Sequence, residues 1–334
     1  MKVVFFQRKP RPDYNFSVEN LFHEVRKELP PLIQQKVKIL SFFSNGFFKR
    51  VYISLEAMFS QGDINHVTGD INFIAIFLKR KKTVLTILDL GFMDQRVGVS
   101  RFLLKLFWIT LPSKRAEVIT TISIATKNEL LRYVNVPPSK IKVVYVPLIS
   151  GFFKNSKSFN KDKPVILQIG TMDNKNVFRL AKALKGLKCH LCIIGDISIE
   201  LLLELRNNTI EYSSFKNLSN QEVYEKYVAA DVVSFVSTVE GFGMPIVEAN
   251  AVGRVVVTSN ISSMPEVAGN AAHLVDPFDI ESIRSGVERV IEDDLYRDQL
   301  ISNGFENTKR FNATTIARRY AEIYDSLLAN RKIS

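Results

Sequence analysis

Short apolar runs of strand length alternate with helical patterns along almost the whole chain, and this alternation constrains the fold more than any other feature. Strands that alternate with helices favour parallel sheets covered by helices. Six expected strands in the first half span residues 3–7, 37–43, 64–68, 83–89, 117–123 and 141–147. Six more in the second half span residues 165–170, 190–195, 210–215, 231–237, 254–259 and 272–276. The sequence therefore predicts an α/β protein with two Rossmann-like, doubly wound parallel sheets.

The expected helices fill the intervals between these strands. They span residues 17–28, 100–111, 125–134, 176–187, 220–230, 280–292, 295–311 and 315–330. Ser219 and Glu222 have the spacing of a capping box at the start of the helix over 220–230.

A polar, basic and turn-rich stretch, SGFFKNSKSFNKDK, divides the two series of strands. We predict a first domain over residues 1–150, a linker over 151–163 and a second domain over 164–310. Residues 311–334 form a terminal helix that could pack back on the first domain. Two such halves would face a cleft, and ligands of doubly wound sheets bind outside the carboxyl ends of the strands.

The positive charge of the chain is confined to its first half. The net charge is +11, but residues 1–150 hold 23 Lys and Arg against 11 Asp and Glu, which gives +12, and the rest holds 22 against 23. Such an imbalance favours an anionic surface, which could be nucleic acid, acidic lipid or a polyanionic substrate. A solvated basic face without any partner would give the same count.

Two further features bear on location and redox chemistry. The N-terminal stretch MKVVFFQRKP is too short in apolar residues for a secretory signal, and no apolar run has membrane-spanning length, so we expect a cytoplasmic protein. Cys189 and Cys192 are the two cysteines, and they lie three residues apart on an expected strand. Side chains so spaced point to opposite faces, which favours two buried thiols over a metal site.

The most informative motif is VEGFGMPIVEAN, residues 239–250, where two glutamates bracket a glycine-rich turn between a buried strand and a helix. Gly241 and Gly243 allow backbone amides to approach a ligand closely. The amides of the new helix present partial positive charge that suits a sugar or an anion. We place Glu248 in the first turn of that helix and expect it to share a pocket with Glu240.

These residues resemble the Glu-x(seven)-Glu motif of retaining glycosyltransferases of family 4, which have the GT-B fold. The resemblance extends to ILQIGTMDNKN (166–176), YEKYVAAD (224–231) and SNISSMPEVAGNAAHLVDPFD (259–279), and to VITTISIATKNEL (118–130) and KIKVVYVPL (140–148) in the first domain. It is close over about residues 115–334 and loose before them.

The resemblance implies a role for each matching residue. Glu240 would stabilise charge on the transferred sugar, Glu248 would hold the ribose of the nucleotide, and Lys175 would neutralise the diphosphate in place of a metal ion. Backbone groups near the donor would come from Gly170, Thr171, Gly241, Phe242, Gly243 and Met244. The donor would be a UDP- or GDP-linked sugar, with no cofactor and no metal, and the sequence contains no Asp-x-Asp to hold one.

The chain departs from the family pattern at three places. Leu88 stands where many relatives have a histidine beside the donor sugar, and His66 is the candidate to replace it as a catalytic residue, or else a structural histidine. An arginine expected after Gly170 or before Lys175 is missing. Basic residues at 8, 9 and 11 replace a glycine-rich first loop, and they could meet a phosphate or an anionic acceptor.

Residues 100–111, SRFLLKLFWITL, allow two interpretations. They could lie in a membrane interface with Trp108 at headgroup depth, or they could form an ordinary buried helix. Together with the basic first half they suggest peripheral attachment to the anionic inner face of a membrane, where a lipid-linked sugar acceptor would lie.

The resemblance implies a metal-independent retaining hexosyltransferase of bacterial surface polysaccharide synthesis. Its partners would be a nucleotide sugar and a glycan or lipid-linked acceptor. We expect no nucleic-acid partner, because no nucleic-acid motif accompanies the basic residues. The alternatives are a nucleotide-sugar epimerase or hydrolase of the same fold, a basic protein that binds nucleic acid or membranes, and a degenerate family member.

Overall fold

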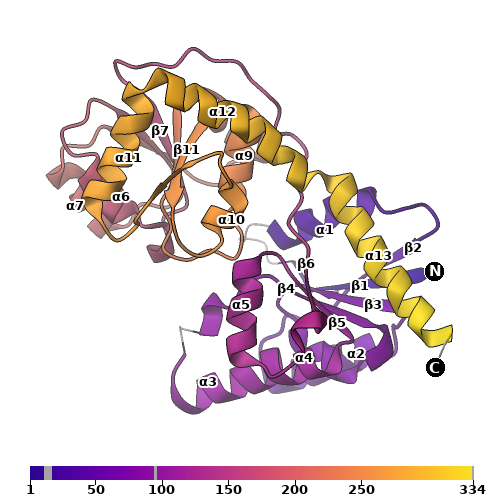
Figure 1. Cartoon of the computed structure of the whole chain (residues 1–334). Coiled ribbons are helices and arrows are strands. Elements are labelled where there is room, and N and C mark those ends of the chain that lie inside the picture. The colour runs from indigo at the N-terminus through magenta and orange to yellow at the C-terminus, as the bar shows by residue number, and fades with distance from the viewer. Residues whose placement is uncertain (11–16, 94–95, 333–334) are drawn as a thin grey trace. The chain divides into compact units, whose positions relative to one another are not determined.

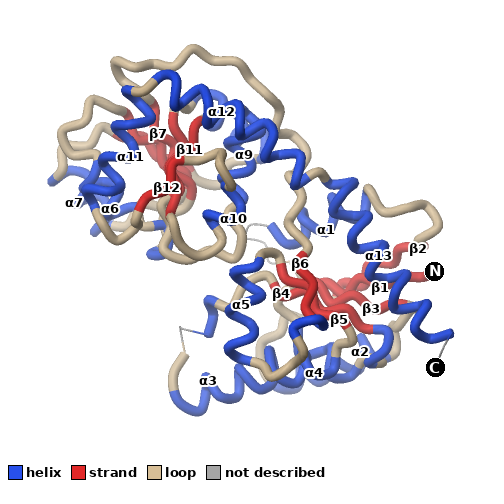
Figure 2. Tube along the Cα trace, in the orientation of Figure 1, coloured by secondary structure: helices blue, strands red, loops and turns tan. Residues whose placement is uncertain are grey.

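The chain folds into two compact units, each built around one parallel sheet (Figure 1). The structure, a computed structural model, describes residues 1–10, 17–93 and 96–332. The first unit consists of Met1–Ile149 together with Asn312–Ser334, and the second of Ser150–Phe311. The two sheets have six strands each, all parallel, with helices against them (Figure 2). The predicted α/β architecture with two doubly wound sheets is confirmed.

The sheet of the first domain has the strand order β2-β1-β3-β4-β5-β6. Its interior strands β1, β3 and β4 are almost wholly buried, as expected for strands of a parallel sheet covered by helices. The strands are β1 (Lys2–Gln7), β2 (Gln34–Ile39), β3 (Ile64–Thr68), β4 (Thr83–Ile87), β5 (Val118–Thr121) and β6 (Ile141–Val143). The helices are α1 (Ser17–Lys27), α2 (Phe47–Met58), α3 (Gly98–Leu104), α4 (Leu111–Arg115), α5 (Ile124–Tyr133) and α13 (Ala313–Lys332).

Three predictions for the first domain need correction. Strand β2 begins three residues earlier than expected, because Gln34 pairs with Lys2 at the start of β1. Helix α2 was not predicted at all. The helix expected over 100–111 is interrupted, because α3 ends at Leu104 and residues Lys105–Thr110 form a π-helical turn before α4. Pro112 lacks the amide hydrogen that an α-helical bond to Trp108 would need, so the wider turn lies where that bond is lost.

Helix α13 completes the first domain from the far end of the sequence. It packs beside α1, and Thr314 Oγ1 donates a hydrogen bond of 2.6 Å to Glu28 Oε2 (Figure 1). The rings of Tyr320 and Tyr324 are buried and lie against Phe22 and Phe5 respectively. The core of this domain is therefore built from residues that are up to 319 positions apart.

The sheet of the second domain has the strand order β12-β11-β10-β7-β8-β9. The strands are β7 (Val165–Ile169), β8 (His190–Ile194), β9 (Tyr212–Phe215), β10 (Val232–Phe235), β11 (Val255–Ser259) and β12 (His273–Val275). The helices are α6 (Val177–Ala183), α7 (Ile199–Asn207), α8 (Asn220–Ala229), α9 (Met244–Val252), α10 (Met264–Ala268), α11 (Ile280–Glu292) and α12 (Asp294–Thr308). The capping box of Ser219 and Glu222 at α8 is confirmed.

The stretch predicted as a linker contains no helix or strand, yet it is bound along the second domain. Lys157 Nζ lies 2.6 Å from both Ala229 O and the buried Asp231 Oδ1. Arg254 Nη1 donates to Asn155 O at 2.9 Å. Ion pairs and backbone hydrogen bonds therefore hold the stretch in place, and the point where the chain leaves the first domain is residue 149 or 150.

Two smaller predictions can be compared directly. Both cysteines are buried and unpaired, as predicted, and burial raises the pKa of the Cys189 thiol to about 11. Among the residues that the structure describes, no helix combines the length and apolar character that a bilayer crossing requires.

Candidate functional site in the second domain

The bracketed motif occupies the loop from β10 to α9, at the carboxyl end of an interior strand. Gly243 is the N-cap of α9 with φ of 112°, a conformation that side chains rarely adopt. A Cβ atom there would also lie 3.2 Å from Ile246 Cδ1 and 3.4 Å from Phe235 Cε1. Glycine is therefore required at this position, and no side chain caps the amides of the first helical turn.

The helix begins one residue earlier than the prediction from Pro245 implied. Met244 is its first residue, so Glu248 lies in the second turn and not in the first. The prediction for Glu248 was wrong because the helical conformation starts directly after Gly243. Its carboxyl group is still close enough to Lys175 for that charge to act on it.

Glu240 in this loop forms an ion pair with Lys175 from the loop after β7. Lys175 ends a short 3-10 turn after β7, and β7 pairs directly with β10. Its Nζ lies 2.5 Å from Glu240 Oε1 and 4.8 Å from the centroid of the Phe235 ring. The two charged side chains are only 14% and 15% exposed. Partial removal from water strengthens the attraction between them, so the pair is held more firmly than a surface ion pair.

Gly170 makes room for Lys175. It has φ of 83°, and a Cβ atom there would lie 3.1 Å from both Cγ and Cε of the Lys175 side chain. The aliphatic part of the lysine therefore runs across the glycine at the end of β7. Thr171 is next in the chain, and its side chain lies close to Gly195, where a Cβ atom would approach it to 2.9 Å.

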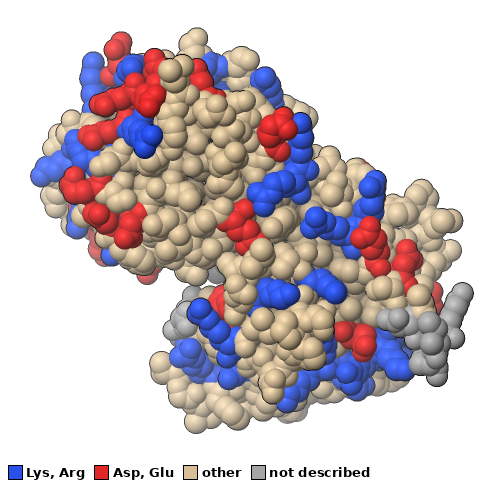
Figure 3. Space-filling view, in the orientation of Figure 1, with Lys and Arg blue, Asp and Glu red and all other residues tan. Residues whose placement is uncertain are grey.

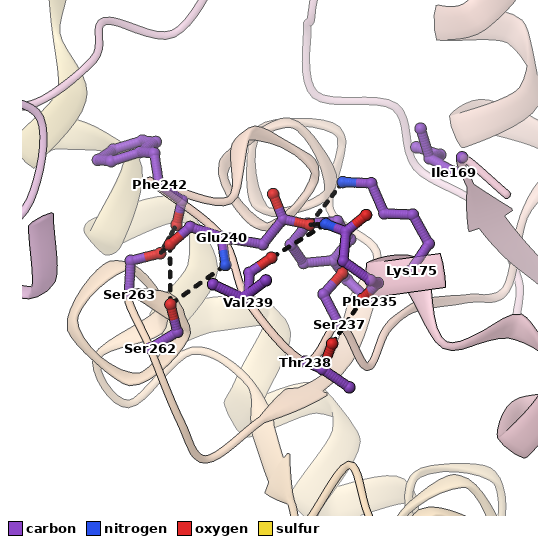
Figure 4. A network of polar contacts seen from close by, with 12 residues as sticks. Ile169, Lys175, Phe235, Ser237, Thr238, Val239, Glu240, Phe242, Ser262 and Ser263 are labelled. Carbon is purple, nitrogen blue, oxygen red and sulfur yellow. Dashed lines mark hydrogen bonds and ion pairs between the residues drawn. The ribbon is translucent and has the colours of Figure 1, made fainter. Parts of the chain in front are cut away.

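Two serines hold the main chain of Glu240 from the side opposite Lys175 (Figure 4). Ser262 Oγ accepts from Glu240 N at 3.1 Å and donates to Glu240 O at 2.8 Å. Ser263 Oγ lies 3.0 Å from Glu240 O and 2.7 Å from Phe242 O. Asn174 adds hydrogen bonds to Val239 O at 3.0 Å and to Glu240 Oε1 at 3.2 Å. The carboxylate is therefore fixed before any ligand arrives.

Glu248 lies in a different environment, although the same lysine acts on it. Tyr227, which is fully buried, donates a hydrogen bond of 2.5 Å to Glu248 Oε2. Burial raises the pKa of Glu248 to about 7, while the Tyr227 hydrogen bond and the Lys175 charge lower it. A carboxyl group that titrates near neutrality at the end of a sheet is typical of functional sites.

The structure thus brings together most of the residues predicted for the site. The loops after the two adjacent strands β7 and β10, together with the start of helix α9, carry all of these residues. They are Gly170, Thr171, Lys175, Glu240, Gly241, Phe242, Gly243, Met244 and Glu248.

His66 is not part of this group. It lies in the middle of β3 in the first domain and has no exposed surface. Its Nδ1 lies 2.7 Å from Tyr324 Oη and its Nε2 lies 2.7 Å from Thr86 Oγ1. Burial, with a smaller effect of the Arg26 charge, lowers the pKa of His66 to about 3. Both ring nitrogens are occupied, so the structure places His66 as a neutral core residue and not as a catalytic one.

The basic first loop is only partly described. Arg8 pairs with Glu19 at 2.9 Å and with Asp70, so its charge is already balanced within the first domain. Arg11 lies outside the described residues.

Comparison with known proteins shows which proteins this chain is similar to. Residues 150–307 match the model of the family described as glycosyl transferases group 1. The second domain is therefore similar to a group 1 glycosyl transferase domain. The matched segment contains every residue of the Lys175, Glu240 and Glu248 site.

Two curated relatives extend the similarity toward the first domain. The O-antigen chain mannosyltransferase B of Escherichia coli is 29% identical over 228 residues, which is 60% of this chain and 59% of that protein. The MMP alpha-(1->4)-mannosyltransferase of Mycolicibacterium hassiacum is 24% identical over 63% of this chain and 54% of that protein. The match therefore spans less than two thirds of the length of either relative.

Solved structures show the fold of the whole chain. HepE from Anabaena, crystallised in complex with UDP and glucose, has a TM-score of 0.77 at 16% identity. The match covers 98% of this chain and 100% of the HepE chain. WaaG, a glycosyltransferase involved in lipopolysaccharide biosynthesis, has a TM-score of 0.69 at 14% identity. The predicted GT-B fold is confirmed, and together these findings support a GT-B glycosyltransferase of group 1.

Sequence reasoning missed the residues that position the site. The roles of Asn174, Ser262 and Ser263 depend on contacts between residues that lie 66 and 22 positions apart in the chain. Tyr227 belongs to the quoted stretch YEKYVAAD, but the sequence does not show that its hydroxyl reaches Glu248. A fully buried tyrosine needs a hydrogen-bond partner, and that was the one available signal.

Proposed function

We propose that this chain transfers a hexosyl group from a UDP- or GDP-linked sugar to a glycan or lipid-linked acceptor, with retention of configuration and without a metal ion. The observation that carries the proposal is the contact of Lys175 Nζ with Glu240 Oε1 at 2.5 Å, inside the segment that matches the group 1 family. A fixed ammonium group and a fixed carboxylate at the end of a sheet suit a substrate whose charges separate during reaction.

Lys175 would act on the leaving group. When the bond between sugar and nucleotide breaks, the departing diphosphate gains negative charge, and a nearly buried ammonium group stabilises that charge more than an exposed one would. The lysine is already oriented by the stem contact at Gly170 and by the Phe235 ring. A diphosphate at this place would compete with Glu240 for the same cation.

Glu240 would act on the sugar. Its main chain is held by Ser262 and Ser263, and its carboxylate is free to accept hydrogen bonds once Lys175 turns toward phosphate. A carboxylate beside the reacting carbon stabilises positive charge that develops on the sugar ring. Glu248, one turn into α9, would accept hydrogen bonds from the ribose hydroxyls in its ionised form.

The names of the relatives indicate the donor to test first. Both relatives described above are mannosyltransferases, and the HepE structure contains UDP and glucose. We therefore expect turnover with a nucleotide-linked mannose or glucose, in the synthesis of a bacterial surface polysaccharide.

The test measures release of nucleotide from GDP-mannose and UDP-glucose in the presence of oligosaccharide and lipid-linked acceptors. We expect Lys175→Ala and Glu240→Ala each to lower the turnover by about 10²-fold or more, because each removes a group aimed at developing charge. Product NMR would show retained anomeric configuration, and a chelator would leave the rate unchanged.

Lys309 and Glu306 provide a matched control, because they form an ion pair of 2.6 Å on the exposed surface of the same domain. Lys309→Ala and Glu306→Ala should leave turnover unchanged. Full activity of both site variants would refute the assignment. Release of free sugar without an acceptor would indicate a hydrolase, and conversion of the donor to an isomer would indicate an epimerase.

A further inference from the structure

Helix α2 of the first domain is apolar on two opposite faces. Ile53 and Ala57 point into the core and have no exposed surface. The outer stripe is formed by exposed residues at spacings of three and four, namely Phe48, Val51, Tyr52, Leu55 and Phe59. A helix at the surface of a globular domain normally carries polar residues on this side. The outer stripe of α2 is therefore as apolar as a helix face that packs against another apolar surface.

A second apolar segment lies next to α2. The Arg50 guanidinium of α2 stacks on the Trp108 ring at 4.6 Å, which joins α2 to the π-helical turn after α3. Figure 2 shows α2, α3 and α4 along the same edge of the first domain. We call the two segments together the α2–α3 surface. Its exposed apolar residues are Phe47, Phe48, Val51, Tyr52, Leu55, Phe59, Val97, Val99, Phe102, Leu103 and Phe107.

The charges around the α2–α3 surface are almost all positive. Residues 42–59 and 96–115 contain one acidic residue, Glu56. Its carboxylate is turned away to Lys38 Nζ at 2.7 Å and Ser41 Oγ at 2.7 Å. The same two segments contain seven cations, which are Lys49, Arg50, Arg96, Arg101, Lys105, Lys114 and Arg115. On the face of the first domain shown in Figure 3, Lys and Arg likewise outnumber Asp and Glu.

We propose that the α2–α3 surface binds the surface of an anionic lipid bilayer. Aromatic and aliphatic side chains enter the boundary between headgroups and acyl chains, while long basic side chains reach the phosphates with their charged ends. Each Lys or Arg near an anionic leaflet raises the partition coefficient about fivefold. The surface thus combines the two attractions that together give stable but reversible attachment.

A second copy of this chain fits the surface less well. Self-association through the α2–α3 surface would bring the basic residues of one copy toward those of the other, and like charges across an interface oppose association. An anionic bilayer has the opposite charge. The inference does not depend on the glycosyltransferase reaction, because all of its residues lie in the first domain and the site residues lie in the second.

The test is co-sedimentation of the full chain with vesicles of phosphatidylcholine alone and with vesicles rich in phosphatidylglycerol. We expect binding to the anionic vesicles only, with an affinity that falls as salt is added. Phe47→Ser combined with Phe48→Ser should lower the partition coefficient about tenfold or more. Trp108, the one tryptophan of the chain, should shift its emission to shorter wavelength when vesicles are added to the native protein.

The second domain offers a matched control for the two phenylalanines. Ile199 is as exposed as Phe47, at 73%, and Leu295 is as exposed as Phe48, at 85%. Ile199→Ser combined with Leu295→Ser should leave binding unchanged.

Three results would overturn the proposal. They are absence of binding to anionic vesicles at low salt, equal loss of binding in the control variant, and a native dimer that the Phe47 and Phe48 substitutions make monomeric. Circular dichroism of each variant would separate loss of binding from loss of fold. Nucleotide-sugar turnover with a water-soluble acceptor should be unaffected, so failure of this proposal is distinguishable from failure of the proposed reaction.

Discussion

Replacing Glu248 by glutamine is expected to stabilise the second domain at alkaline pH and to weaken donor binding at the same time. The pKa of Glu248 rises from its ordinary value of 4.5 to about 7 in the folded chain, because burial disfavours the charged form. An acid with a raised folded pKa stabilises the fold below its unfolded pKa, and that stability is lost as the pH rises through the folded pKa.

The magnitude follows from these two values. Each pH unit between them corresponds to about 1.4 kcal/mol, so the ionised carboxylate lowers the free energy of unfolding by on the order of 3 kcal/mol at pH 8. Glutamine is neutral, has nearly the same shape and can accept the Tyr227 hydrogen bond. Glu248→Gln should therefore match the natural chain near pH 4.5, exceed it progressively up to pH 7 and stay about 3 kcal/mol more stable above that.

The two buried cysteines provide the assay. Cys189 and Cys192 are the only thiols of the chain and both lie in the second domain, so their labelling rate in native buffer reports the opening of that domain. Natural chain and variant are compared at equal pH, which cancels the titration of the thiols themselves. Trp108 fluorescence in urea reports the first domain and should show no difference.

Equal labelling of both proteins at pH 8, or faster labelling of the variant, would refute the reasoning about Glu248. If Glu248→Gln is more stable and also binds nucleotide sugar normally, the electrostatic effect of Glu248 on stability is supported. Glu248 would then not be a residue that binds the donor. Stability gained at the cost of binding is the expected outcome, since functional sites often hold unfavourable charges.

Two further predictions concern other positions. Gly170→Ala should lower turnover strongly and destabilise the second domain by about 1–3 kcal/mol, because the backbone has φ of 83° and the new Cβ atom would press on the aliphatic part of Lys175. Steady-state kinetics measure the loss of turnover, and thiol labelling measures the loss of stability. Lowering the pH from 7 to 5 should destabilise the first domain by about 2 kcal/mol through His66, whose lowered pKa contributes stability above 6.5 that is lost at acid pH. Urea unfolding followed by Trp108 fluorescence would show this dependence, and His66→Asn should flatten it.

The sheets were predictable from sequence because their strands are buried on both faces. β1, β10 and β11 each contain a run of Val or Phe between turn residues, and such runs have few alternative structures. Strand β2 is mostly exposed at the edge of its sheet, and its boundaries were misplaced for that reason.

Helix α2 escaped prediction for a different physical reason. Periodicity reveals a helix when one face is apolar and the other polar, but α2 is apolar toward the core and also toward the outside. The apolar character of both faces explains why α2 was not predicted, and it also makes the outer face the candidate membrane surface.

The charged residues and glycines of the candidate site could be predicted from sequence, because they lie in two short motifs, residues 166–176 and 239–250. The serines that hold Glu240 come from another loop, and the covering of His66 by Tyr320 and Tyr324 comes from a helix about 250 residues further on. No local pattern reports such contacts. The sequence shows that His66 lies within a strand. It does not show that tyrosines of the C-terminal helix α13 help to bury the imidazole ring.

The return of α13 to the first domain has a consequence for folding during synthesis. Most domains fold in the order in which they leave the ribosome, with the N-terminal domain first. Here Ser150–Phe311 is continuous and forms its compact unit without Asn312–Ser334. The first domain must wait for Tyr320 and Tyr324 to cover the ring of His66. The domain that is translated first is therefore the one that completes its core last. Until α13 packs, Phe5 and Phe22 lack the tyrosine rings that contact them in the folded domain.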